Sequence, residues 1–86
     1  LLDDLGQRGL SRTLLVVMGE FGRTPRINKD AGRDHWHHAY SMMLAGGGIK
    51  DGAVLGRTGR DGAYPVAGRV VRPGDLWATV YRCLGI

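Results

Sequence analysis

A short apolar run at residues 13–18, Thr-Leu-Leu-Val-Val-Met, sets the strongest limit on how this chain folds. The run is too short for an ordinary helix, is rich in β-branched residues, and lacks the polar alternation of a strand with one solvated face. These properties predict a strand that is buried on both faces, as in α/β sheets. Ligands of such sheets bind beyond the carboxyl ends of the strands, where this chain places Gly19 and Glu20.

Size and composition narrow the function classes. The chain has 86 residues, fifteen of them glycine, so we expect at most one small domain with a modest core. The single cysteine, Cys83, excludes a disulfide framework and is predicted to be a buried packing residue. The net charge of +4 comes from arginines spread singly through glycine-rich loops, so we expect no nucleic-acid partner. No run approaches about 18 apolar residues, so we expect no membrane span.

The remaining segments predict a mixed order of helices and strands. Residues 1–8 are predicted to form the last turns of a helix that ends at Gly6 or Gly9. A chain that starts inside a helix suggests part of a longer protein. Residues 19–33 read as a surface loop, residues 40–45 as a second buried strand, and the three glycines that follow as a tight turn. A brief strand is predicted at residues 70–72. A final helix is predicted over residues 75–84, introduced by Pro73 and Gly74, with Asp75 as N-cap and Gly85 as its C-cap glycine.

The candidate ligands gather behind the first strand. Glu20 is the only glutamate, and Asp34 is followed by His35, His37 and His38. In an extended segment His35 and His37 share a face, and in a helix His35 and His38 do, so either geometry brings two imidazoles together. The alternatives are ordinary: a loop histidine bonded to backbone, and a Glu20 paired with a nearby arginine.

Two further residues of this region have open roles. Arg23 either holds an anionic oxygen through two parallel hydrogen bonds or is simply solvated. Trp36 is predicted to be a packing residue rather than a substrate platform.

Three motifs carry a family resemblance. They are Gly-Glu-Phe-Gly-Arg-Thr-Pro at residues 19–25, Gly-Arg-Asp-His-Trp at residues 32–36 and Leu-Ala-Gly-Gly-Gly-Ile at residues 44–49. Together with Leu2, Leu5 and residues 8–10 they resemble the bacterial family known as domain of unknown function 1501, over nearly the whole chain. That family is similar to the alkaline phosphatase and sulfatase superfamily, whose members act on phosphate and sulfate esters with one or two divalent metals.

The resemblance implies a fold and an incomplete domain. It implies that residues 1–86 are the C-terminal part of an alkaline-phosphatase-like α/β/α sandwich with a largely parallel sheet. The strands at residues 13–18 and 40–45 are then neighbours or near neighbours, and the last helix lies on the sheet. The chain therefore needs the remainder of its own domain as a partner, and the nucleophile is expected upstream of this chain.

The resemblance also implies a metal site. Glu20 stands where the superfamily has a metal-binding aspartate, and Phe21 stands where it has a metal-binding histidine and cannot ligate. Asp34 and His35 resemble an Asp-His segment of metal-dependent phosphomutases whose histidine binds the other metal. We expect His35 and Glu20 to converge on one pocket, within about 4 Å of each other, with Asp34 as a further ligand or as the partner that orients the imidazole.

The expected function follows from these residues. The resemblance implies a metal-dependent hydrolase of phosphate or sulfate esters, with zinc, calcium, magnesium or manganese as the ion and a small anionic ester as substrate. Arg23 and His38 are the expected substrate-binding residues, and a place in the cell envelope or outside the cell is implied by the family alone. The alternative is a degenerate relative that keeps the fold for binding or assembly, which Phe21 favours.

Overall fold

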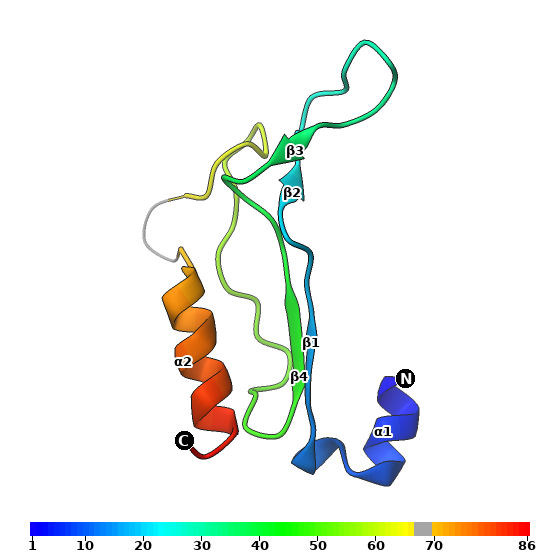
Figure 1. Cartoon of the computed structure of the whole chain (residues 1–86), viewed down its shortest axis with the longest axis vertical. Coiled ribbons are helices and arrows are strands. Elements are labelled where there is room, and N and C mark those ends of the chain that lie inside the picture. The colour runs from blue at the N-terminus through cyan, green and yellow to red at the C-terminus, as the bar shows by residue number, and fades with distance from the viewer. Residues whose placement is uncertain (67–69) are drawn as a thin grey trace. The chain divides into compact units, whose positions relative to one another are not determined.

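The computed structural model describes residues 1–66 and 70–86, which divide into two compact units (Figure 1). The first unit consists of Leu1–Val17, Met43–Val54 and Val71–Ile86, and the second of Met18–Met42 and Leu55–Val70. The first unit holds both α-helices and one strand pair, whereas the second holds a shorter strand pair and long loops. Among the described residues no helix is both long enough and apolar enough to cross a bilayer.

The first unit is built on strands β1 (Leu14–Val17) and β4 (Met43–Gly46), which lie side by side in Figure 1. β1 lies within the strand predicted at residues 13–18, β4 overlaps the strand predicted at residues 40–45 and runs on to Gly46, and the two are neighbours as expected. The two strands run antiparallel, with Leu14 opposite Gly46 and Val17 opposite Met43, whereas the sheet as a whole was predicted to be largely parallel. Parallel neighbours need a crossover connection, usually a helix, and residues 18–42 form none. Since mixed sheets also contain antiparallel pairs, the α/β/α sandwich stays a prediction.

The glycine turn after β4 has a steric cause. Gly46 has a φ of 113°, and a Cβ at this position would collide with the carbonyl oxygen of Thr13. The next residue, Gly47, donates its backbone N–H to the same Thr13 oxygen at 3.1 Å. The turn therefore needs glycine both for its backbone angle and for the close approach of the two chain segments.

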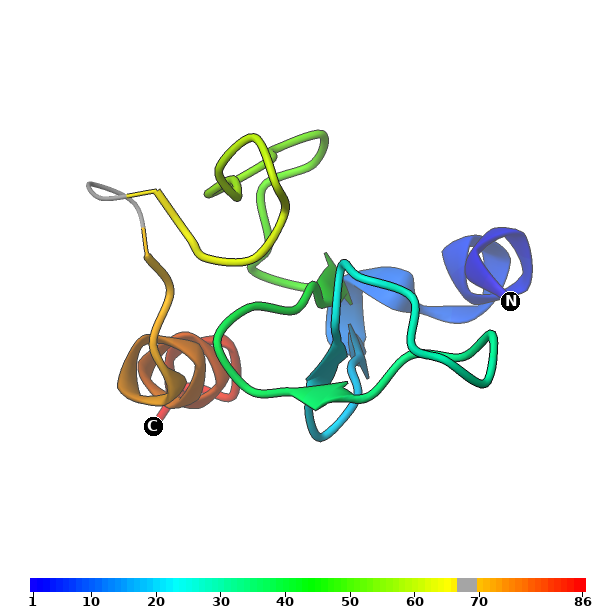
Figure 2. The ribbon, with the colours of Figure 1, turned by 90° about the horizontal axis from the view of Figure 1, so that it is seen from above.

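Helix α1 (Leu2–Arg8) ends at Gly9, which has a φ of 120°, and a single 3₁₀ turn, η1 (Leu10–Arg12), leads into β1. The end at Gly9 confirms one of the two predicted positions. An ion pair between Asp4 and Arg8 at 3.0 Å spans one helical turn, but both side chains are exposed and the pair adds little stability. Helices α1 and α2 lie on opposite sides of the β1–β4 pair (Figure 2).

Helix α2 (Pro73–Cys83) starts two residues before Asp75, the predicted N-cap, and its N-cap is Arg72. Asp75 caps the helix from inside its first turn, because its Oδ2 accepts the backbone N–H of Arg72 at 2.8 Å. At the other end Gly85 has a φ of 77° and donates its N–H to Arg82, while Ile86 donates to Tyr81. This Schellman motif confirms Gly85 as the glycine that ends the helix.

Burial in the first unit is slight. Among the described residues Leu76 of α2 is the one hydrophobic side chain classed as buried, at 6% exposed. Cys83 is half-buried, while Val17 and Met43 at the ends of the strands are 50% and 43% exposed. The strands are therefore not buried on both faces by the described residues. The prediction of a strand at residues 70–72 is wrong: none of these residues lies in a strand, and Arg72 is the extended N-cap of α2.

The second unit holds two strands that the sequence did not predict, β2 (Gly22–Arg23) and β3 (His35–Trp36). They pair antiparallel, with Gly22 opposite Trp36 and Arg23 opposite His35. Gly22 is required here, because a Cβ would collide with the carbonyl oxygen of Ala39. Residues 57–66 form a small turn with a bridge between Thr58 and Pro65.

Candidate functional site

The candidate residues lie on the β2–β3 ribbon, on the loop that joins its strands and on the residues directly before and after it, all within the second unit. His35 is exposed, and its ring stacks on Phe21 with centroids 3.8 Å apart and planes tilted by 30°. The guanidinium carbon of Arg23 lies 5.4 Å from the centroid of the same Phe21 ring. We call Phe21, Arg23 and His35 the Phe21 cluster. Phe21 thus takes a supporting role, since it contacts both polar side chains and has no ligand atom of its own.

Asp34, next to His35, is held by Asn28. The Asn28 Nδ2 donates to Asp34 Oδ1 at 3.1 Å, while its Oδ1 accepts the backbone N–H groups of Asp30 and Gly32 at 2.9 and 3.0 Å. These two backbone donors fix which end of the amide is oxygen and therefore turn the NH₂ toward Asp34. One half-buried side chain thus shapes the loop and orients a carboxylate.

The two ends of this loop are joined by Thr24 and Arg33. Thr24 donates its backbone N–H to the Asp34 carbonyl at 3.0 Å, and its Oγ1 accepts the Asp34 N–H at 3.1 Å. The Arg33 Nη1 donates to the carbonyl oxygens of Thr24 and Pro25, both at 2.7 Å. The backbone at Asp34 is therefore anchored on both sides, immediately before His35.

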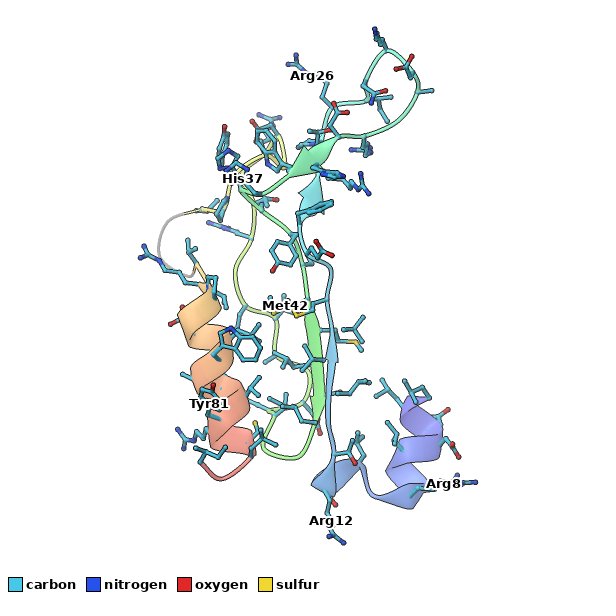
Figure 3. All side chains as sticks on the ribbon, viewed as in Figure 1. Arg8, Arg12, Arg26, His37, Met42 and Tyr81 are labelled. Atoms are coloured by element: carbon cyan, nitrogen blue, oxygen red, sulfur yellow. The ribbon has the colours of Figure 1, made fainter. Side chains whose placement is uncertain are left out.

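His37 and His38 belong to a separate group of rings. His38 lies 4.6 Å from Trp36, 3.9 Å from His37 and 4.9 Å from Tyr64 between ring centroids. The Trp36 Nε1 donates to the Ala63 carbonyl at 2.6 Å, which fixes the position of the indole. We call Trp36, His37, His38 and Tyr64 the ring cluster; Figure 3 labels His37 just after β3. Among the described residues, ring contacts join His37 to His38, and neither of them to His35.

A hollow of about 580 Å³ opens beside this ribbon. Its apolar lining comes from Pro25, Ile27, Trp36 and Ala63. Its polar lining comes from Thr24, Arg26, Asn28, Asp34 and Asp61. Asp61 is anchored at its end of the hollow, because its Oδ1 accepts the backbone N–H of Ala63 at 3.1 Å. The hollow is large enough for an organic ligand and is bordered by one of the predicted metal ligands, Asp34.

The predicted metal ligands are only partly brought together. Asp34 and His35 are sequence neighbours on an anchored backbone, whereas Glu20 is exposed and forms no hydrogen bond or ion pair with another described residue. Among residues 1–66 and 70–86 no group of three His, Cys, Asp or Glu side chains is placed to hold a metal ion. The convergence of Glu20 and His35 on one pocket stays a prediction.

Sequence reasoning missed the residues that shape this site, above all Asn28, Arg33 and Asp61. One signal was available for Asn28, because asparagine in a polar loop often accepts backbone N–H groups a few residues ahead, and Asp30 and Gly32 follow it. The same signal was available for Asp61, whose Oδ1 accepts the N–H of Ala63 two residues ahead. Arg33 gave no such signal, since its partners are the backbone carbonyls of Thr24 and Pro25, which only the folded loop brings near.

Comparisons with known proteins agree with the motifs. The sequence profile of the family described as "Protein of unknown function (DUF1501)" matches residues 1–86. Neither a curated protein nor a solved structure matches the chain. Because the match spans all 86 residues, the chain belongs to this family of proteins of unknown function, DUF1501.

Proposed function

We propose that this chain supplies part of the metal site of a hydrolase that acts on phosphate or sulfate esters. In this proposal His35 and Asp34 serve the metal site from the β2–β3 ribbon, Glu20 is a further ligand, and Arg23 and His38 contact the anionic substrate. The chain acts together with the remainder of its domain, which is to supply the nucleophile.

The observation that carries the proposal is the anchored Asp34–His35 pair. Both side chains are exposed, yet each is held in place: Asp34 by the Asn28 amide at 3.1 Å and His35 by the Phe21 ring at 3.8 Å. No arginine or lysine among the described residues forms an ion pair with Asp34. A carboxylate and an imidazole that are oriented in this way suit a metal site better than two solvated side chains, because held ligands lose little freedom on binding.

The donor types fit a divalent ion. Carboxylate oxygens and imidazole nitrogens are ligands for zinc and manganese, and carboxylates also serve magnesium and calcium. Such an ion, when bound, polarises a phosphoryl or sulfuryl oxygen or lowers the pKa of water. Because no third ligand is gathered among the described residues, His35 and Asp34 can supply only part of the coordination shell.

The charge of the second unit is compatible with an anionic substrate. Its sequence carries more basic than acidic residues: Arg23, Arg26, Lys29, Arg33, Arg57, Arg60 and Arg69 against Glu20, Asp30, Asp34 and Asp61. Arg23 lies directly opposite His35 across the ribbon, so an ester bound at His35 comes within reach of a guanidinium.

A second candidate function is favoured by the same contact between His35 and Phe21. Phe21 stands at a position where the resemblance expects a second ligand, and its ring packs on His35 instead. In this alternative the domain is degenerate and binds or assembles without catalysis. The two candidates differ in one simple property, because only the hydrolase must retain metal on purification.

The test is a metal analysis and an ester assay on the intact protein and two histidine variants. We expect the protein to purify with a divalent metal and to hydrolyse phosphate or sulfate monoesters. His35→Ala should weaken metal binding by at least roughly 10- to 100-fold and remove the activity. The matched control is His37→Ala, an exposed imidazole of the ring cluster, which should change neither property.

Two results would count against the hydrolase. If the wild-type protein carries no metal, the degenerate domain is the better account. If His35→Ala keeps the full metal content, then His35 is no ligand, and the stacking on Phe21 is its whole role.

A further inference from the structure

We infer that the hollow beside Asp34 is a binding site for the hydroxylated, sugar-like organic part of a ligand, with Asp61 as its main recognition residue. The inference deepens the proposed function and rests on it only for the catalytic context, because binding of an unesterified sugar needs no turnover. Three observations carry it: a firmly held wall, an apolar surface beside polar groups, and a lining that offers both hydrogen-bond donors and acceptors.

The wall is held by hydrogen bonds rather than by a core. The loop at residues 24–34 is largely exposed, yet Asn28, Thr24 and Arg33 bond its backbone at several points. On the other side, Trp36 is fixed by its 2.6 Å hydrogen bond to Ala63, whose own N–H donates to Asp61. Long exposed loops are usually mobile or functional, and a surface ordered in advance spends less entropy when a ligand binds.

The polar groups indicate hydroxyls. Asp34 and Asp61 each use Oδ1 in a hydrogen bond, and within the described residues Oδ2 of each carboxylate has no donor. Arg26, which also lines the hollow, supplies N–H donors. A hydroxyl group both donates and accepts, whereas an ammonium group only donates. A mixed lining of two acceptors and a donor therefore fits neighbouring hydroxyls better than a simple cation.

The apolar part of the lining and the volume indicate a ring. Pro25, Ile27 and the Trp36 indole give the hollow an apolar side that can cover the C–H face of a sugar. A volume of about 580 Å³ exceeds what a lone phosphate or sulfate needs, and two carboxylates in the lining repel an anion. We therefore place the phosphate or sulfate group of the ester near the proposed metal at Asp34 and His35, and the organic group of the ester in the hollow.

The experiment is a calorimetric titration of the intact, metal-loaded protein with D-glucose, D-galactose and choline chloride. We expect weak saturable binding of at least one sugar and none of choline. Asp61→Asn keeps an oxygen for the Ala63 N–H, so the loop stays folded, but it replaces one acceptor by a donor. Sugar binding should weaken by roughly 5- to 10-fold, as expected for one lost hydrogen bond.

Controls separate this inference from the proposed function. Asp51→Asn changes an exposed aspartate of the first unit and should leave sugar binding unchanged. Asp61→Asn should leave the metal content unchanged, because Asp61 is not among the proposed metal ligands. Binding of choline in place of the sugars, binding of neither, or equal losses in the Asp51 and Asp61 variants would each overturn the inference. A protein without esterase activity that still binds sugar through Asp61 would overturn the hydrolase alone.

Discussion

The two units of the chain are held together by different interactions. The first unit relies on paired strands and on the burial of the Leu76 side chain, which is 6% exposed. The second unit has no buried hydrophobic side chain among its described residues, and hydrogen bonds from Asn28, Thr24 and Arg33 hold its loop. Every residue proposed here for metal or substrate binding lies in the second unit.

This difference has a physical meaning for function. Apolar packing is nondirectional and tolerates small shifts, whereas a network of hydrogen bonds fixes orientations and leaves its polar groups close to solvent. A site that must bind an ion and an anionic ester needs oriented, accessible polar groups. The loop of the second unit offers these groups, and the first unit offers the anchor from which the loop extends in sequence.

The largest expected effect concerns the first unit when the chain is produced alone. Large apolar side chains such as Val17, Met43 and Trp77 are about half exposed, so residues 1–86 leave much apolar surface without cover. We expect the isolated chain to aggregate or to remain partly folded, measured by size-exclusion chromatography and thermal melting. A monomer that melts in one sharp two-state transition would contradict this expectation.

The next effect is the loss of the Leu76 side chain. In the intact protein Leu76→Ala should lower the free energy of unfolding by about 2–3 kcal/mol, because it removes the most buried apolar group of the described chain. Leu84→Ala is the matched control on the same segment, since Leu84 is 62% exposed, and it should cost less than about 0.5 kcal/mol. Denaturant titration measures both, and similar losses in the two variants would show that α2 packs by another face.

In the second unit, a substitution of Asn28 should change only the loop around it. Asn28→Ala removes the acceptor of the Asp30 and Gly32 N–H groups, so exchange of these two amides with solvent should accelerate by roughly 10-fold, while the β1 amides keep their rates. Asn28→Asp keeps that acceptor but loses the donor to Asp34. It should therefore retain amide protection and, if Asp34 serves the metal, still lower metal affinity. If exchange of the β1 amides accelerates equally, the Asn28 hydrogen bonds stabilise the whole chain rather than the loop alone.

Part of this organisation was predictable from the sequence. The apolar runs located β1 and β4, and the Pro-Gly-Asp and Gly85 signals located the ends of α2 to within a residue or two. Local composition does not encode the direction of pairing, so the antiparallel register of β1 and β4 was missed. Strands of two residues, such as β2 and β3, are too short to show any periodicity.

The candidate site, too, could be predicted from the sequence only in part. Its residue types and their sequence neighbourhood were visible, as with Asp34 and His35, but their contacts depend on folding. The stacking of His35 on Phe21 follows from the pairing of β2 with β3, which places Arg23 opposite His35 and brings Phe21 beside it. The hydrogen bonds of Asn28 and Arg33 arise only once the loop closes on itself.

The smallest expected effect is a stabilisation in the first unit. Gly74 lies in the first turn of α2 without a positive φ, and a Cβ there would meet no atom within 4 Å. Gly74→Ala should raise the free energy of unfolding by about 0.4–1 kcal/mol, because alanine has less backbone freedom to lose. Gly85→Ala is the opposing control, since the φ of 77° at Gly85 disfavours any Cβ, and it should cost about 1 kcal/mol. Thermal or denaturant unfolding of the intact protein shows whether each variant raises or lowers the free energy of unfolding. If both variants shift stability in the same direction, helix α2 does not begin and end where Arg72 and Gly85 place it.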